Sequence, residues 1–238
     1  MIPQPSPTAT EPVTSASDFD DFIYVLSHDI RSCVRASLEL PQWIEEDLEE
    51  AGVRIDQPLA EKFGLMHTHM RRLDRMLGDL LEYSRVGRMQ TPRPVDLNAV
   101  LEEVLHRRPL PQGFTLHRRI EGRGPHMGPI DAERLLAALL SNAAKHHDRP
   151  CGHVSIETQE ASGLCILTVS DDGPGIAEAH RNSVFDPMTL LKSRDELEGS
   201  GMGLTIVRKI VHHYGGELRW CMPADARGAV LEIRLPTG

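Results

Sequence analysis

The sequence predicts an α+β protein: an N-terminal helical hairpin that forms a dimeric four-helix bundle, followed by a two-layer α/β sandwich. Three observations predict this fold class. Two long stretches near the N-terminus repeat apolar residues at alternating steps of three and four, the spacing of a helical seam. Later stretches alternate between helix and strand patterns. The last two strand patterns are separated by glycine and proline, which indicates an antiparallel pair in a mixed sheet covered by helices on one face.

The composition is that of an ordinary globular protein. The chain has 238 residues, of which 40% are hydrophobic and 26% are charged, and its formal net charge is −9. A nucleic-acid partner favours the opposite charge, so none is expected. We expect no membrane span, because no apolar run approaches the roughly 18 residues that cross a bilayer. We also expect no signal peptide, because the N-terminus lacks a basic region followed by an apolar one. The four cysteines are scattered without a CxxC pair, which favours reduced thiols and a cytoplasmic location.

Shifts in composition divide the chain into four segments. Residues 1–17 are rich in Pro, Ser and Thr and are expected to be a disordered tail or linker. Residues 18–87 contain the two seams, separated by a turn, and form the predicted hairpin. Residues 88–95 contain two prolines and are a short linker. Residues 96–238 carry the α/β pattern and form the second domain.

The hairpin segment predicts a homodimer. Asp18 is the expected N-cap of its first helix, and Pro41 is expected to bend that helix. One hairpin buries too little apolar surface to be stable alone, whereas two hairpins form a four-helix bundle. The seam residues are Phe19, Ile23, Leu26, Ile30, Cys33, Ser37, Leu40 and Ile44, then Leu59, Phe63, Met66, Met70, Leu73, Leu77, Leu80 and Ser84.

The second domain is predicted element by element from its periodicity. Asp96 is the expected N-cap of its first helix. The predicted helices span 96–108, 131–147 and 204–214, and the predicted strands span 114–120, 153–158, 164–170, 217–221 and 229–235.

His28 lies off the first seam. It is two residues from both Leu26 and Ile30, about 200° around the helix from either, and so it is predicted to face solvent. A neutral imidazole is a nucleophile near pH 7, because its unperturbed pKa is about 6.5. The neighbouring carboxylate of Asp29 can accept a proton from the other ring nitrogen. By itself this pattern also fits a solvated surface histidine.

The run Ser27-His28-Asp29-Ile30-Arg31-Ser32 resembles the phosphoacceptor motif of sensor histidine kinases, usually written Ser-His-Glu-Leu-Arg-Thr-Pro. Cys33 stands where the family usually has Pro. The resemblance implies that His28 is the phosphorylated residue and that Asp29 assists it. It also implies that Ser32, one turn further, positions a water that dephosphorylates a partner, although a plain surface serine is the alternative.

A glycine-rich turn, Gly199-Ser200-Gly201-Met202-Gly203-Leu204, opens the predicted helix 204–214. Alternating glycines permit a tight turn, and a helix start presents unpaired N–H groups to an anion, so this turn is a candidate phosphate site. A dinucleotide fingerprint requires glycine at position 204, and a P-loop requires Gly-Lys-Ser/Thr, which the sequence lacks.

Three motifs before this turn extend the resemblance. The run 139–146 looks like the family's Asn-box, with Ala138 where another Asn is common. The resemblance implies that Asn142 binds Mg²⁺, that Lys145 neutralises phosphate charge and that His146 lies near the phosphates. After a strand, the run 171–176 implies that Asp171 accepts a hydrogen bond from the adenine amino group.

In the same turn Gly173 and Gly175 are expected to let the backbone pass under the base. The run 184–188 looks like the Phe-box, with Met188 in place of its second aromatic residue. Residues 189–198 fit a mobile lid, from which Lys192 and Arg194 either reach the γ-phosphate or remain solvated.

These ordered motifs cover roughly residues 18–236 and resemble the catalytic core of sensor histidine kinases, with the Bergerat-type ATP fold of the kinase, gyrase and heat-shock-chaperone superfamily. The run 81–88 also resembles kinase modules of bacterial phytochromes. The resemblance implies that the chain binds ATP with Mg²⁺, phosphorylates His28 and transfers the phosphoryl group to an aspartate of a response regulator. The signal is expected from a removed sensor or from a separate sensor protein.

Two alternatives remain open. One is a non-catalytic histidine phosphotransfer or scaffold protein with a degenerate ATP domain, which Ala138 and Met188 favour. The other is a serine kinase of the anti-sigma type, which has the same ATP fold but needs no histidine-bearing hairpin.

Overall fold

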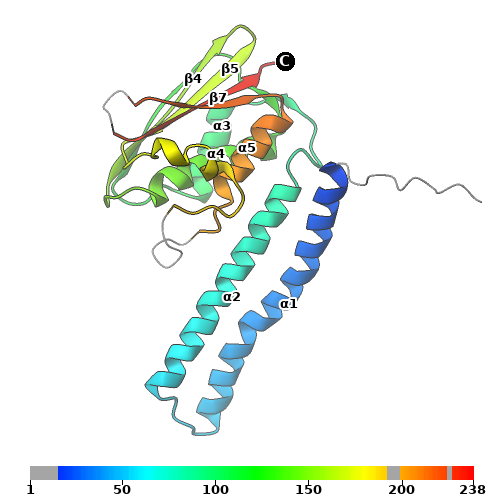
Figure 1. The fold of residues 1–238 in the computed structure, drawn as a ribbon, viewed down its shortest axis with the longest axis vertical. Helices are drawn as coiled ribbons and strands as arrows, with labels where there is room; N and C mark the ends of the chain where they lie inside the picture. Colours follow the sequence, from blue (N-terminus) through cyan, green and yellow to red (C-terminus); the bar gives the residue numbers. More distant parts are fainter. Residues whose placement is uncertain (1–15, 192–198, 224–226) are drawn as a thin grey trace, which may run out of the picture.

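The computed structural model describes residues 16–191, 199–223 and 227–238. Two long helices, α1 (Ala16–Glu50) and α2 (Gln57–Ser84), form an N-terminal hairpin, and an α/β domain follows (Figure 1). α1 begins at Ala16, so Asp18 lies inside the helix and is not its N-cap. Acidic residues are favoured in the first helical turn as well as at the cap, and the sequence did not separate the two positions.

The hairpin is held by a narrow buried face. α2 begins after its N-cap Asp56, whose carboxylate accepts a hydrogen bond from the Leu59 N–H at 3.0 Å. α1 continues through Pro41 as one helix. Arg31 of α1 donates from Nε to Asp74 Oδ1 of α2 at 2.9 Å, one turn after His28. The residues buried between the helices include Ser27, Val34, Phe63, Leu77 and Leu81.

A stripe of seam residues stays exposed on the single hairpin. Six apolar seam side chains are between 38% and 48% exposed, although the seam pattern predicts their burial. They are Leu26, Ile30, Leu40, Ile44, Met66 and Leu73. We call these six residues the open stripe. The surface that each helix of the hairpin buries against the other therefore differs from much of its apolar seam.

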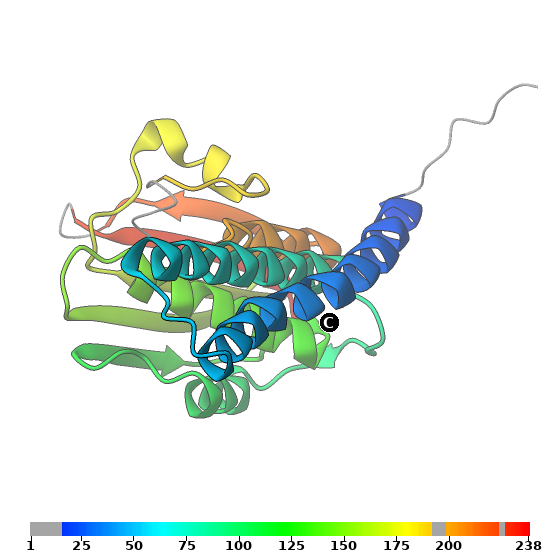
Figure 2. The same cartoon turned by 90° about the horizontal axis from the view of Figure 1, so that it is seen from below.

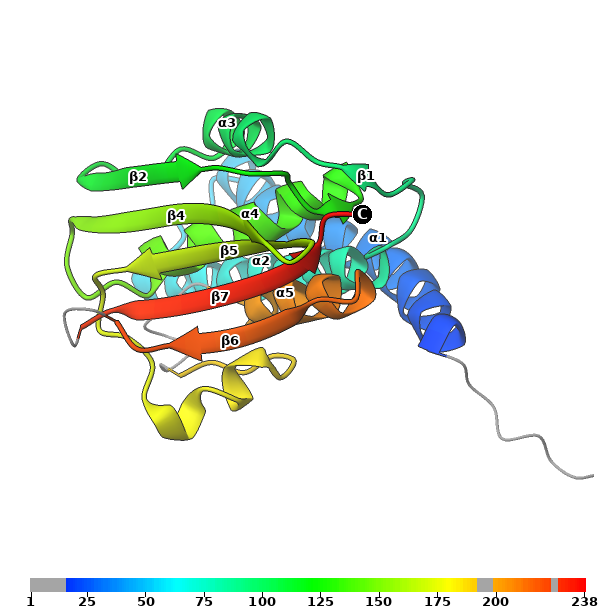
Figure 3. The ribbon, with the colours of Figure 1, turned by 90° about the horizontal axis from the view of Figure 1, so that it is seen from above.

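The α/β domain contains a five-stranded mixed sheet in the order β2-β4-β5-β7-β6. Its strands are β2 (Phe114–Ile120), β4 (Gly152–Ala161), β5 (Leu164–Asp171), β6 (Glu217–Cys221) and β7 (Ala229–Pro236). β2 pairs with β4 in parallel, and the other neighbours are antiparallel, including the predicted pair β6 and β7. Figure 3 shows the sheet in front of its helices, with the hairpin behind them.

Three helices cover one face of this sheet: α3 (Leu97–Arg107), α4 (Pro129–Lys145) and α5 (Gly203–His213). Asp96 caps α3 as predicted, accepting a hydrogen bond from the Asn98 N–H at 2.9 Å. The core between sheet and helices contains fully buried side chains such as Leu101, Leu135, Ile156 and Ile233. Such burial contributes on the order of 25 cal/mol per Å² of apolar surface. The predicted hairpin and two-layer sandwich are confirmed, and the four-helix bundle remains a prediction.

Short elements were not predicted. β1 (Arg93–Pro94) pairs with β3 (His126–Met127), and two 3₁₀ turns span Glu178–His180 and Ser183–Phe185. Elements of two or three residues are too short to show a period. α4 also ends at Lys145 and not at the expected His147, so both following histidines lie in the loop after the helix.

The hairpin and the α/β domain meet at a buried carboxylate. Asp131, at the start of α4, is 0% exposed and accepts hydrogen bonds from the Gly87 N–H at 2.7 Å and the Tyr214 hydroxyl at 2.8 Å. Arg134 Nη1 donates to the same carboxylate at 2.9 Å. The carboxylate therefore joins the end of the hairpin to α4 and to the residue after α5.

Candidate functional site

A cavity of about 790 Å³ lies between α4, the start of α5, the end of β5 and the side of α2. Its volume is in the range of small-molecule sites. Most of the residues predicted to bind nucleotide line it: Asn142, Lys145, His146, Asp171, Gly175, Gly199, Ser200, Gly201, Gly203 and Leu204. Residues that are far apart in the sequence therefore form one continuous wall.

Gly173 and Met202 are not among the described residues that line the cavity. The Met202 side chain is 1% exposed in the core, and its N–H donates to Ser200 Oγ at 3.1 Å. The Gly173 N–H donates to Asp171 Oδ1 at 3.0 Å. Both residues thus act behind the wall, one as a core side chain and one as a backbone donor.

Asp171 ends β5 with its carboxylate at the cavity. Its Oδ1 accepts hydrogen bonds from the N–H groups of Gly173, at 3.0 Å, and Ala229, at 3.3 Å. Burial raises the pKa of Asp171, and the two backbone donors act in the opposite direction. A half-buried carboxylate fixed by two amides is suited to accept a hydrogen bond from a planar ligand.

Two turns of the cavity wall require glycine. Gly175 has φ +73°, and a Cβ there would lie 2.6 Å from the carbonyl oxygen of Gly228. Gly201 has φ +76°, and a Cβ there would lie 2.7 Å from the carbonyl oxygen of Thr189. Any other residue would meet both backbone strain and a collision with main-chain atoms.

The start of α5 is suited to hold an anion. Among the described residues, no side chain of the N-cap bonds to the first turn, and Gly203 and Leu204 both line the cavity. The unpaired N–H groups and the helix dipole favour negative charge at this point. Lys145, at the end of α4, lines the same cavity and adds a cation.

The wall from α4 differs from the family pattern at one position. Asn142 and Ser141 line the cavity, and so does Ala138, where the resemblance places another Asn. The wall therefore offers one side-chain amide at Asn142 and a methyl group one turn earlier. An amide oxygen is a suitable ligand for Mg²⁺, which completes its shell with waters and phosphate oxygens.

His28 is exposed on α1. Its side chain is 64% exposed, and its Nδ1 lies 3.2 Å from Asp29 Oδ1. The Ser32 hydroxyl donates to the His28 carbonyl oxygen at 3.5 Å. The Tyr24 ring stacks against the imidazole with 6.4 Å between ring centres.

The structure does not bring His28 to the cavity. Among the described lining residues, the hairpin contributes Arg75, Asp79 and Glu82, all from α2. Seen along the hairpin, α2 crosses the α/β domain while α1 runs to its side (Figure 2). None of these three residues was predicted from the sequence. Their spacing places them on one face of α2, but no local sequence pattern indicates that this face contacts the α/β domain.

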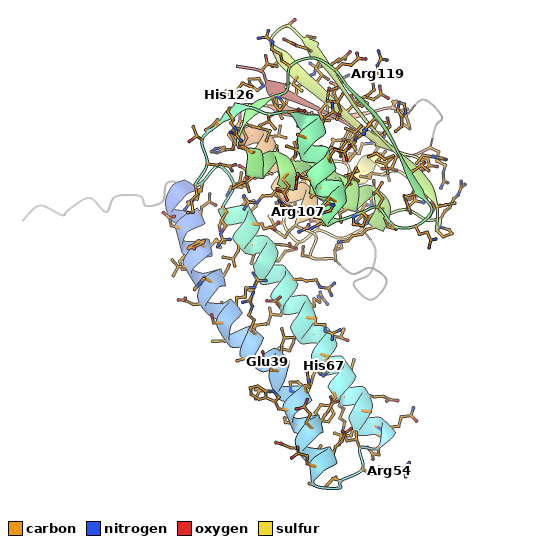
Figure 4. All side chains as sticks on the ribbon, turned by 180° about the vertical axis from the view of Figure 1, so that it is seen from behind. Glu39, Arg54, His67, Arg107, Arg119 and His126 are labelled. Carbon is orange, nitrogen blue, oxygen red and sulfur yellow. The ribbon has the colours of Figure 1, made fainter. Side chains whose placement is uncertain are left out.

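Other parts of the site add contacts that the sequence did not predict. Arg107, at the end of α3, lines the cavity and pairs with Glu133 of α4 at 2.6 Å, on the side of the domain toward the hairpin (Figure 4). Within the expected Phe-box, Phe185 packs against Trp220, with ring centres 5.6 Å apart. Lys192 and Arg194 lie outside the described residues.

Comparison with known proteins agrees with this arrangement. Residues 127–238 match the family described as histidine kinase-, DNA gyrase B- and HSP90-like ATPase. The adaptive-response sensory kinase SasA of a Synechococcus species is 28% identical over 92% of this chain and 60% of its own length. The signal transduction histidine-protein kinase AfsQ2 of Streptomyces coelicolor is 30% identical over 90% of this chain and 41% of its own.

Solved structures show the same fold. Full-length ShkA, crystallised in complex with AMPPNP, aligns with a TM-score of 0.65 at 20% identity, over 91% of this chain and 46% of its own. The mycobacterial sensor histidine kinase MprB aligns with a TM-score of 0.53 at 29% identity, over 61% of this chain and 97% of its own.

Fold, site and relatives support a sensor histidine kinase catalytic core, and residues 127–238 match the ATPase family. Cyanobacterial phytochrome B of a Nostoc species, 28% identical over 93% of this chain and 30% of its own, agrees with the phytochrome-like resemblance. The chain thus spans between 30% and 60% of the length of these three relatives. None of the described helices is apolar enough over a sufficient length to cross a bilayer.

Proposed function

We propose that this protein is an ATP-dependent histidine kinase that phosphorylates His28 and passes the phosphoryl group to an aspartate of a response-regulator receiver domain. The single observation that carries the proposal is the cavity, which gathers Asn142, Lys145, Asp171 and the glycine turn of α5 around one space. The matching ATPase family supports ATP as the ligand, as does the AMPPNP-bound neighbour.

In this proposal the cavity binds ATP from its two ends. Asp171 accepts a hydrogen bond from the adenine amino group, and the first turn of α5 holds the phosphates together with Lys145. The amide oxygen of Asn142 would hold Mg²⁺, which would neutralise phosphate charge. Catalysis then depends mostly on the position and the charge of the γ-phosphate.

His28 is the nucleophile. A proton on Nδ1, shared with Asp29 across 3.2 Å, leaves the lone pair of Nε2 free on the exposed edge of the ring. Nε2 attacks the γ-phosphorus, the N–P bond forms as the bond to the bridging oxygen breaks, and ADP leaves. The carboxylate of Asp29 stabilises the positive charge that develops on the ring.

Transfer of the phosphoryl group to His28 of the same chain requires the α/β domain to move. His28 is separate from the cavity, whose hairpin side consists of Arg75, Asp79 and Glu82 among the described residues. The α/β domain must therefore swing about the linker, residues 88–95, to reach His28 of the same chain. A second chain offers another His28, because we propose that the open stripe is the interface of a homodimer with a four-helix bundle.

The response regulator is proposed to dock on the hairpin near His28, and the cytoplasm is the proposed location. Ser32 is proposed to assist dephosphorylation of that partner. This last role is supported by the likeness to a protein of Mycolicibacterium paratuberculosis named signal transduction histidine-protein kinase/phosphatase MprB, which is 30% identical over 81% of this chain and 37% of its own length.

Labelling with ATP that is radioactive at its γ-phosphate tests the proposal. His28→Ala should abolish labelling and leave ATP affinity nearly unchanged. The control His69→Ala changes an exposed histidine of α2 and should keep both the labelling and the ATP affinity of the wild type. The label should be lost in acid and survive in base. Label that persists in His28→Ala, or that resists acid, contradicts the proposal and favours the serine kinase. Failure of the wild type to bind ATP in a titration with Mg²⁺ favours the non-catalytic phosphotransfer protein with a degenerate ATP domain.

A further inference from the structure

We propose that His147 is a positioning residue of the nucleotide site, which fixes the turn after β5 against the end of α4 and thereby orients Asp171 toward adenine. The inference rests on the proposed binding of ATP. His147 lies directly after the motif that ends at His146, and neither its spacing nor the family resemblance singled it out.

The His147 ring is buried and held at both nitrogens. Its side chain is 1% exposed. Nδ1 lies 3.0 Å from the Arg149 nitrogen and 3.2 Å from the Arg149 carbonyl oxygen, and Nε2 lies 3.1 Å from Asp172 Oδ1. A carboxylate accepts, so Nε2 carries a proton and donates it to Asp172. The contacts at both nitrogens therefore fix the direction of the ring.

The space around the ring leaves it one orientation. The Phe114 ring meets it edge-on, with 5.3 Å between the ring centres. A Cβ at Gly152 would lie 2.8 Å from Nε2, and a Cβ at Gly173 would lie 3.3 Å from Cδ2. Two glycines from different elements thus provide the room that the imidazole occupies.

Asp172 is the point at which several elements meet. Its Oδ1 also accepts a hydrogen bond from the His153 N–H at 2.6 Å, and its carbonyl oxygen accepts one from Arg227 Nε at 2.9 Å. Arg227 in turn pairs with Asp148 at 2.6 Å. Although burial acts to raise it, the bonds from His153 and His147 hold the pKa of Asp172 below its usual range.

This network connects the two walls of the cavity. α4 carries Asn142 and Lys145, and the turn that begins at Asp171 carries the Gly173 N–H that bonds to the Asp171 carboxylate at 3.0 Å. His147 joins the end of α4 to that turn through Asp172. Loss of the imidazole should therefore shift Asp171 at the base end, while the start of α5, at the phosphate end, stays in place.

Three variants test the inference. His147→Leu removes both ring hydrogen bonds, whereas His147→Gln keeps a side-chain N–H that can reach Asp172. His117→Leu, at an exposed position of β2, is the matched control. We expect His147→Leu to raise KM for ATP about tenfold with kcat nearly unchanged, since one hydrogen bond to a charged group is lost. His147→Gln should restore KM to within about threefold of the wild type.

Competition separates the two ends of the site. Tripolyphosphate, which carries no base, should inhibit the wild type and His147→Leu with equal potency, whereas ADP should lose about tenfold against the variant. An unchanged KM for ATP in His147→Leu overturns the inference. A raised KM that His147→Gln does not restore also overturns it, as does an equal loss of potency for tripolyphosphate and ADP. Failure of the wild type to bind ATP is a different outcome, because it overturns the proposed function itself.

Discussion

The buried carboxylate of Asp131 gives a prediction whose size follows from its geometry. Tyr214→Phe removes one of its donors, the hydroxyl at 2.8 Å, and leaves the aromatic ring in place. The Gly87 N–H at 2.7 Å and Arg134 at 2.9 Å remain bonded to the carboxylate. The variant therefore loses one hydrogen bond to a charged acceptor without leaving an unpaired buried charge.

The expected loss of stability is about 1.5–3 kcal/mol, the range for a hydrogen bond to a charged group. For a protein of this size such a loss lowers Tm by roughly 3–12 °C. Removal of the carboxylate partner Arg134 should cost more, since it would leave a buried charge without its cation.

The pH dependence provides a second readout. Burial, and then the neighbouring Asp131, raise the pKa of Tyr214 well above its usual value near 10. A raised pKa in the folded state gives a stabilisation that is complete below the unfolded pKa and is lost as pH rises through the folded pKa. The difference in stability between wild type and Tyr214→Phe should thus be constant up to about pH 10 and shrink above it.

Thermal unfolding followed by circular dichroism measures this difference. Tyr24→Phe is the matched control, because Tyr24 lies on α1 and its hydroxyl has no part in the cluster at Asp131. Equal midpoints for Tyr214→Phe and Tyr24→Phe would show that the hydroxyl at Asp131 does not stabilise the junction, and the reasoning would be refuted.

Two further predictions concern the cavity and the hairpin. Burial raises the pKa of Asp171, so the ionised carboxylate lowers the stability of the folded state above that pKa. Asp171→Asn should therefore raise Tm at neutral pH, and calorimetry should show weaker ATP binding by the variant. For the same reason, acidification should begin to weaken ATP binding by the wild type at a higher pH than it would if Asp171 had the pKa of an ordinary aspartate. ATP affinity that falls only at the pH expected of an ordinary aspartate contradicts this prediction. Leu73→Glu in the open stripe should convert a dimer into monomers in light scattering, whereas Leu65→Glu, 59% exposed and outside the stripe, should not, and a dimer that survives Leu73→Glu argues against this interface.

The long helices and strands of the fold and the order of the motifs follow from the sequence alone. The strands 114–120 and 217–221 and the Asp96 cap of α3 match their predictions residue for residue. Periodicity, caps and glycine turns act between residues a few positions apart, so a linear sequence contains them. For the same reason the glycine turn at the start of α5 and the Asn-box on α4 were identified before their contact in one cavity was known.

The folded chain was needed to show which of these surfaces meet. The contact of Tyr214 with Asp131, the wall that α2 adds to the cavity and the bond from His147 to Asp172 join residues far apart in the chain. The separation of His28 from that cavity likewise depends on how the hairpin docks against the α/β domain. Local patterns establish which face of a helix is apolar or charged, but the neighbour of that face is selected by packing of the whole chain, which no short-range pattern encodes.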